Sequence, residues 1–140
     1  MTVYLDTSVV LSRLLGQSNA LESWGDWERV YTSVLTRVEF LRVIDRLRLE
    51  GEIGDSERVA LHRQFGLLWE VCHRIPLTPH ILNRAAEPFP TVLGTLDALH
   101  LASALALGPD LEEPLVFLTH DQQLARAAES LGLQVEGTTP

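Results

Sequence analysis

The sequence contains no lysine, because all 11 of its basic residues are arginine. This absence excludes a P-loop, whose lysine contacts the nucleotide phosphates, and any mechanism that proceeds through a lysine Schiff base. Cysteine is almost absent too, since Cys72 stands alone. A single cysteine excludes an internal disulfide and a cysteine-based zinc site. We expect Cys72 to be a small buried side chain and the protein to reside in a reducing, cytoplasmic environment.

Long apolar runs and an excess of basic residues are also missing. No stretch is long enough to span a membrane, and the opening residues lack the basic start of a signal peptide. With 19 acidic residues the formal net charge is −8, whereas a protein that only grips nucleic acid is usually basic. The charge indicates either another kind of partner or bound divalent cations, which reverse the local field.

Hydrophobic residues make up 46% of the 140 residues, which suits a single domain over residues 1–140 with a substantial core. Apolar runs alternate with helical periodicity and cap signals, and the Pro- and Gly-rich stretches 88–90 and 108–114 are expected to be surface loops. Strands are predicted at 2–6, 29–32, 74–78, 115–119 and 134–136, and helices at 8–15, 20–24, 34–50 (capped by Ser33), 55–71, from Pro79, 95–107 (capped by Thr95) and 121–131. This alternation predicts an α/β fold in which helices cover both faces of a parallel sheet.

Two acidic residues lie where predicted strands end. Asp6 follows the first strand and Asp121 follows the strand at 115–119. Ligands of parallel sheets bind at the carboxyl ends of the strands, which favours a functional site. Each acid could instead cap the helix that follows it, and position alone leaves these two interpretations of Asp6 about even.

Two more acids lie on apolar helices. Glu39 has apolar neighbours one turn away on each side, and a buried lone charge is costly; an ordinary ion pair with Arg42 is the alternative, and by itself the better one. Asp97 could simply favour its helix dipole, but the scarcity of polar residues on this helix favours a shared polar site. His100, on the same face as Asp97, is either a hydrogen-bond partner or, more commonly, a satisfied core histidine.

Brought together, four carboxylates would repel one another and would need bound cations to remain ionised. All-oxygen ligands select Mg²⁺ or Mn²⁺, and two such ions would balance four negative charges. Two ions can hold an attacking water and stabilise the leaving oxygen at a phosphodiester.

Four short motifs in order carry a resemblance that covers the whole chain. They are LDTS at 5–8, TRVEF at 36–40, LDALHLA at 96–102 and LTHDQQL at 118–124. Together they resemble the PIN-domain nucleases, and the size and motif order resemble the VapC-type toxins of bacterial toxin–antitoxin pairs. The resemblance implies a three-layer α/β/α sandwich with a central, mostly parallel sheet. It implies cleavage of RNA by activated water, with one or two Mg²⁺ or Mn²⁺ ions.

The resemblance also assigns roles to residues and partners. Asp6, Glu39, Asp97 and Asp121 match the acidic positions of the family, Thr119 matches a hydroxyl position near the site, and Ser8 is expected to hydrogen-bond Asp6. Expected partners are an RNA substrate, an antitoxin protein that blocks the site and a second copy of the chain in a homodimer.

Three questions stay open at this point. Arg13, Arg37 and Arg42 are candidates for gripping RNA because they lie near the motifs, although a solvated helix face is the preferred interpretation of them. A phosphatase with Asp6 as nucleophile is disfavoured, because Ser8 stands where its second aspartate is usual and its lysine cannot exist here. A catalytically inactive PIN-like binding module, acting through protein or RNA contacts, is the alternative to an enzyme.

Overall fold

Two runs of four consecutive buried residues form the centre of the structure. In the computed structural model, which describes residues 1–138, every residue of β1 (Thr2–Leu5) and β4 (Leu115–Leu118) is buried. Strands buried on both faces are typical of parallel sheets. The other strands are β2 (Arg29–Ser33), β3 (His73–Ile75) and β5 (Gln134–Glu136). The helices are α1 (Thr7–Leu14), α2 (Leu35–Leu49), α3 (Asp55–Val71), α4 (Pro79–Ala85), α5 (Thr95–Leu107) and α6 (Gln122–Ser130), with a short 3₁₀ helix η1 (Gly108–Asp110).

The strands form one sheet in the order β3-β2-β1-β4-β5, and all four neighbouring pairs are parallel. From β1 the chain continues to β2 on one side, whereas from β4 it continues to β5 on the other. The connections therefore part between β1 and β4, and the carboxyl ends of all strands lie at one edge. This arrangement confirms the predicted α/β fold with a parallel sheet.

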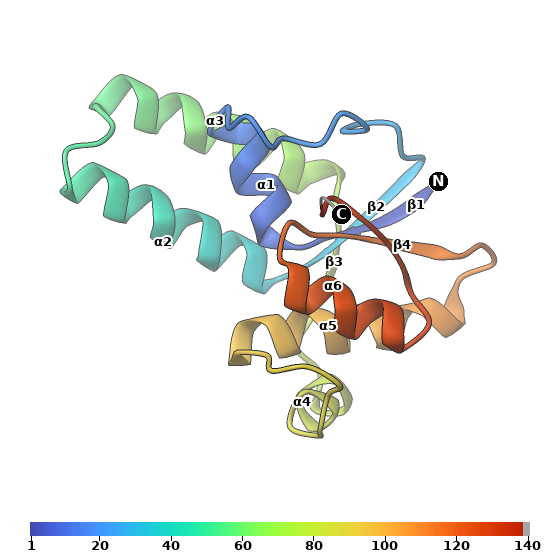
Figure 1. Cartoon of the computed structure of the whole chain (residues 1–140). Helices are drawn as coiled ribbons and strands as arrows, with labels where there is room; N and C mark the ends of the chain where they lie inside the picture. Colours follow the sequence, from blue (N-terminus) through green and yellow to red (C-terminus); the bar gives the residue numbers. More distant parts are fainter. Residues whose placement is uncertain (139–140) are drawn as a thin grey trace.

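Alternate residues of the central strands supply two separate cores. Val3 and Leu5 belong to the cluster that packs against α1, α2 and α3, whereas Tyr4 and Phe117 belong to the cluster under α5 and α6. Tyr4 and Phe117 stack with their ring centroids 5.3 Å apart. The sheet is thus the middle of three layers, with α1 to α3 over one face and α4 to α6 over the other (Figure 1).

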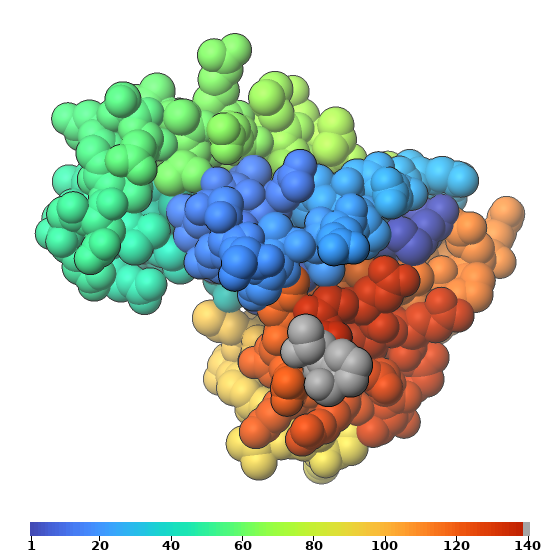
Figure 2. Space-filling view, turned by 45° about the horizontal axis from the view of Figure 1, so that its top comes forward, coloured from blue at the N-terminus to red at the C-terminus, as the bar shows by residue number. Residues whose placement is uncertain are grey.

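Helices α2 and α3 form a hairpin that projects beyond the sheet (Figure 1). Gly51, with φ of 75°, ends α2 in the left-handed conformation that glycine adopts readily. Phe40 and Phe65 stack across the hairpin with centroids 4.5 Å apart. Figure 2 shows the segment of roughly residues 10–30, in blue, lying between this hairpin and the carboxyl-terminal third of the chain.

Several predicted boundaries are wrong for local reasons. Residues 20–24 form turns rather than a helix, because the segment is short and Gly25 takes φ of 89° directly after it. Strand β3 stops at Ile75 rather than Thr78, since Pro76 has no N–H to donate to a neighbouring strand. Gly94 rather than Thr95 occupies the N-cap position of α5. Ser33 ends β2 and Val34 takes the cap position of α2, although the Ser33 hydroxyl accepts the Leu35 N–H.

Cys72 follows α3 and is buried, as expected. Burial raises the pKa of its thiol to about 11, which keeps it protonated and unreactive at neutral pH. Among the helices of residues 1–138, none combines the length and apolar character needed to cross a bilayer.

Candidate active site

The parting of the chain between β1 and β4 places two polar segments side by side at the carboxyl edge of the sheet. Asp6 follows β1 directly, and its backbone N–H donates to the Leu118 carbonyl at 3.0 Å, which extends the strand pairing by one residue. Thr119 follows β4 and is fully buried. Such a crevice is where open α/β sheets bind their ligands.

Asp6 is held by hydroxyl groups from both sides of this crevice. Its Oδ2 accepts hydrogen bonds from Ser8 at 2.7 Å and from Thr119 at 2.8 Å, so the predicted contact with Ser8 is present. The side chain is only 5% exposed. Asp6 occupies the N-cap position of α1 but its carboxylate makes no capping hydrogen bond. Helix capping therefore does not explain this buried carboxylate.

Glu39 reaches the same crevice from α2. Its Oε1 accepts a hydrogen bond from Thr7 at 3.0 Å and lies 2.6 Å from Nε2 of His100. The expected ion pair with Arg42 is wrong, because Arg42 contacts Asp45 instead, at 3.1 Å. Glu39 thus points inward, toward the sheet edge.

His100, on α5, links the acids to the core. Its Nε2 lies 2.6 Å from Glu39 Oε1 and 3.8 Å from Asp6 Oδ1, and its Nδ1 lies 2.7 Å from the Tyr4 hydroxyl. A carboxylate only accepts, so Nε2 carries the proton toward Glu39, and in a neutral ring the Tyr4 hydroxyl donates to Nδ1. Burial lowers the pKa of His100, but the hydrogen bond to Glu39 and the charge of Asp6 outweigh it, and the pKa is raised. His100 is therefore a satisfied core histidine whose partner is Glu39 rather than Asp97.

Asp97 lies in the first turn of α5 and is half-buried. Its pKa is raised to about 6, mainly by burial and then by the negative charges of Asp6 and Asp121. Glu39 adds to this rise and His100 opposes it. The charges of the other three predicted acids therefore all act on Asp97 at this edge of the sheet.

Asp121 has a structural role that the other strand-end acid lacks. Its Oδ1 accepts the Leu124 N–H at 2.8 Å, which caps α6. Its own N–H donates to the Thr119 hydroxyl at 3.1 Å. The side chain is exposed, so the capping explanation accounts for one of its two oxygens and leaves the other accessible.

Substitutions at Asp121 should separate these two roles. Asp121→Ala removes the cap and should lower the free energy of unfolding by about 1 kcal/mol, whereas Asp121→Asn keeps the acceptor and should be nearly neutral for stability. Urea denaturation measures both effects. If the charge also serves the site, both variants should lose the metal-dependent activity of the site. Asp121→Asn with wild-type activity would leave Asp121 as a helix cap only.

The oxygen donors around the crevice fit a hard divalent cation by their chemistry. Burial and then the charges of Asp6 and Asp121 raise the pKa of Asp97, so a cation bound beside it would favour its ionised form. Within residues 1–138, however, no three His, Cys, Asp or Glu side chains are already placed to hold one ion together. A site of this kind suits an ion that keeps several of its waters and takes only one or two carboxylates, as Mg²⁺ commonly does.

Two residues of the site were not predicted. The hydroxyl of Thr7 donates to Glu39, and the position of Thr7 next to Asp6 was the available signal. Tyr4 reads as an ordinary strand residue, and nothing in the sequence pairs it with His100. Among the arginine candidates, Arg13 lies over the ring of Trp24 and Arg37 is exposed.

Comparison with known proteins agrees with this arrangement. The sequence model of the PIN-domain family matches residues 3–130, a range that contains all four acids. The chain belongs to the PIN-domain family. The PIN-domain chain is 31% identical to ribonuclease VapC47 of Mycobacterium tuberculosis over 137 residues, covering 93% of this chain and 92% of the relative. It is 32% identical to ribonuclease VapC46 of the same species over 138 residues, covering 95% of each chain.

Solved structures resemble this PIN domain in fold at low sequence identity. VapBC2 from Rickettsia felis, crystallised with a DNA fragment from its promoter, gives a TM-score of 0.67 at 12% identity and covers 97% of this chain and 98% of that one. A toxin–antitoxin complex from Klebsiella pneumoniae gives a TM-score of 0.62 at 16% identity, with 88% and 89% covered. These likenesses support the three-layer α/β/α architecture.

Proposed function

We propose that this PIN domain is a metal-dependent endoribonuclease that hydrolyses RNA phosphodiester bonds and serves as the toxin of a toxin–antitoxin pair. The observation that carries the proposal is the environment of Asp6. It is a buried carboxylate at the sheet crevice. Two hydroxyl groups donate hydrogen bonds to it, and it makes no hydrogen bond that caps a helix. Two relatives that span nearly the whole chain are named ribonucleases.

In the proposed site Asp6 and Asp97 would hold the principal Mg²⁺ or Mn²⁺ ion, Glu39 would contribute directly or through water, and Asp121 would help to hold a second ion or orient the ligands of the first. Bound there, the ion would lower the pKa of a water so that it can attack a phosphodiester. Ser8 and Thr119 fix the orientation of the Asp6 carboxylate. His100 and Thr7 hold Glu39, and no side chain forms a covalent intermediate.

An antitoxin protein is the second proposed partner. The two solved structures compared above come from toxin–antitoxin assemblies, and a partner that covers the carboxylate crevice would block access of RNA. The homodimer expected from the resemblance stays a prediction.

The purified protein tests the activity directly. We expect it to cleave RNA with Mg²⁺ or Mn²⁺ present, to stop when EDTA is added and to recover when excess ion is restored, followed on denaturing gels. A stable fold that binds no Mn²⁺ by calorimetry and cleaves no RNA would contradict the proposal and favour an inactive binding module.

We further expect Tyr4 to act as a positioning residue through His100. Tyr4→Phe removes the hydroxyl that fixes Nδ1 of His100 and leaves the stacked ring in place. Losses at residues that orient a metal ligand are commonly 10–100-fold, so we expect kcat to fall about tenfold and the Mn²⁺ concentration for half-maximal activity to rise. The KM for RNA should stay unchanged.

Tyr31→Phe is the matched control, because Tyr31 lies on the neighbouring strand β2 and stacks on His73. It should behave as wild type in both assays. A Tyr4→Phe protein with unaltered Mn²⁺ dependence would show that Tyr4 only fills the core.

A further inference from the structure

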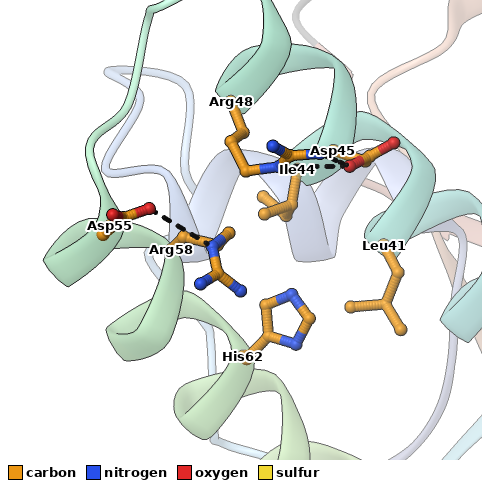
Figure 3. Close-up of a pocket in the computed structure, with 7 residues that line it drawn as sticks. All are labelled: Leu41, Ile44, Asp45, Arg48, Asp55, Arg58 and His62. Atoms are coloured by element: carbon orange, nitrogen blue, oxygen red, sulfur yellow. Dashed lines mark hydrogen bonds and ion pairs between the residues drawn. The ribbon is translucent and has the colours of Figure 1, made fainter.

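A pocket of about 450 Å³ lies between α2 and α3, within the projecting hairpin (Figure 3). Helix α2 supplies its apolar floor and one charged wall, and α3 supplies the other wall. The lining residues are Leu41, Ile44, Asp45, Arg48, Asp55, Arg58 and His62. None of them belongs to the carboxylate crevice, so the nuclease chemistry proposed above leaves this pocket without a role.

Arg58 carries a buried donor that lacks an acceptor. Its Nε is buried and has no hydrogen-bond partner, and among the described side chains it is the one buried nitrogen or oxygen atom in this condition. The nearest carboxylate oxygen, on Asp55, is 3.9 Å away and belongs to a side chain that is 93% exposed. An unsatisfied buried donor is costly, and more so when it is charged. The pocket therefore offers a guanidinium group to an acceptor that comes from outside the chain.

The carboxylates around the pocket do not satisfy the Arg58 Nε donor. Asp45 is already bound by Arg48 at 2.8 Å and by Arg42 at 3.1 Å, and these contacts lower its pKa. Among the lining residues, two guanidinium groups (Arg48 and Arg58) face two carboxylates (Asp45 and Asp55), of which Asp45 is paired with arginine and Asp55 is exposed. Figure 3 shows the Arg58 guanidinium and the His62 ring next to each other on the α3 side of the pocket, across from Leu41.

We propose that this pocket binds a backbone phosphate of the RNA substrate. Arg58 and His62 donate to the phosphate oxygens, and the apolar floor of Leu41 and Ile44 packs against the attached ribose. A guanidinium group matches phosphate geometry with two parallel hydrogen bonds. The proposal rests on the nuclease function proposed above, and it supplies one guanidinium contact to the RNA backbone.

The position of the pocket suits an RNA strand that also reaches the crevice. Glu39 and Asp45 lie six residues apart on the same helix, a rise of about 9 Å. Because α2 turns through about 600° over six residues, the two side chains leave the helix on different sides, and the RNA strand would pass around α2 to reach both. The pocket would then hold the strand beside the cleaved bond without taking part in the chemistry.

Arg58→Gln tests the assignment, with Arg63→Gln as the matched control. Both residues lie on α3 and both changes remove one positive charge, but Arg63 is exposed and lies outside the pocket. We expect Arg58→Gln to raise the KM for RNA about fivefold with kcat unchanged, and to reduce the slope of log affinity against log salt by about 1. Arg63→Gln should leave both quantities unchanged.

Equal KM values for the two variants would overturn the proposal, as would a defect of Arg58→Gln confined to binding of a protein partner. His62→Gln provides a second variant should Arg58→Gln fail to fold, and it should raise KM by a smaller factor. Wild-type protein that cleaves no RNA would reject the proposed function rather than the pocket. In that case an NMR titration with inorganic phosphate decides: a saturable shift of the His62 ring that is lost in Arg58→Gln supports the pocket, and its absence rejects it.

Discussion

Replacing Asp6 with asparagine should reduce metal-dependent RNA cleavage by at least about a thousandfold. This loss corresponds to about 4 kcal/mol of transition-state stabilisation, since each 1.4 kcal/mol changes a rate about tenfold. The amide keeps an oxygen for the Ser8 and Thr119 hydroxyls, so the fold should survive. It removes the negative charge that would bind the ion. Cleavage rates at saturating Mn²⁺, together with thermal unfolding, measure both expectations.

Asp26→Asn is the control for this substitution. Asp26 is exposed in the turns before β2, at the amino-terminal edge of the sheet and away from the crevice. It should retain wild-type activity. If Asp6→Asn cleaves RNA as fast as Asp26→Asn does, the crevice is not the catalytic site.

Asp97→Asn should change activity and stability in opposite directions. Its carboxylate has a pKa of about 6 in the folded protein, above its ordinary value of 3.8, because of burial and the charges of Asp6 and Asp121. The folded state therefore holds the proton more tightly than the unfolded state does. Stability is then lost as pH rises between these two values, and the penalty is complete above pH 6. For a half-buried group it amounts to about 1–3 kcal/mol.

The neutral asparagine removes this penalty. In EDTA at pH 7.5, Asp97→Asn should be more stable than wild type by about 1–3 kcal/mol, and at pH 4 most of the difference should disappear. Nuclease activity with Mn²⁺ should fall by at least about a hundredfold, as expected for loss of a metal ligand that contributes several kcal/mol. Urea denaturation at the two pH values tests the first expectation. A variant that is less stable than wild type at pH 7.5 would contradict the electrostatic account.

The elements that the sequence predicted well are those whose pattern has one physical explanation. The runs TVYL and LVFL were predicted as strands and form the two buried strands at the sheet centre. The acids that follow them share an edge because these strands are parallel. Asp121, with its helix start, was correctly recognised as a possible cap.

What could not be predicted depended on contacts between distant segments. Local spacing favoured Arg42 as the partner of Glu39. The actual partner is His100, which lies 61 positions away in the sequence. The hydroxyl of Tyr4 meets the His100 ring across 96 positions. Burial by the fold, rather than helical spacing, decided both pairings, and single-sequence periodicity carries no information about them.

The backbone bond from the Asp6 N–H to the Leu118 carbonyl has a consequence for motion. It joins the first acid of the crevice to the two central, fully buried strands. Amides in such positions exchange with deuterium only when the whole domain opens, whereas loop amides exchange during local fluctuations. Asp6 should therefore rank among the slowest-exchanging amides of the chain, so that an incoming RNA meets a rigid floor and must itself bend to fit.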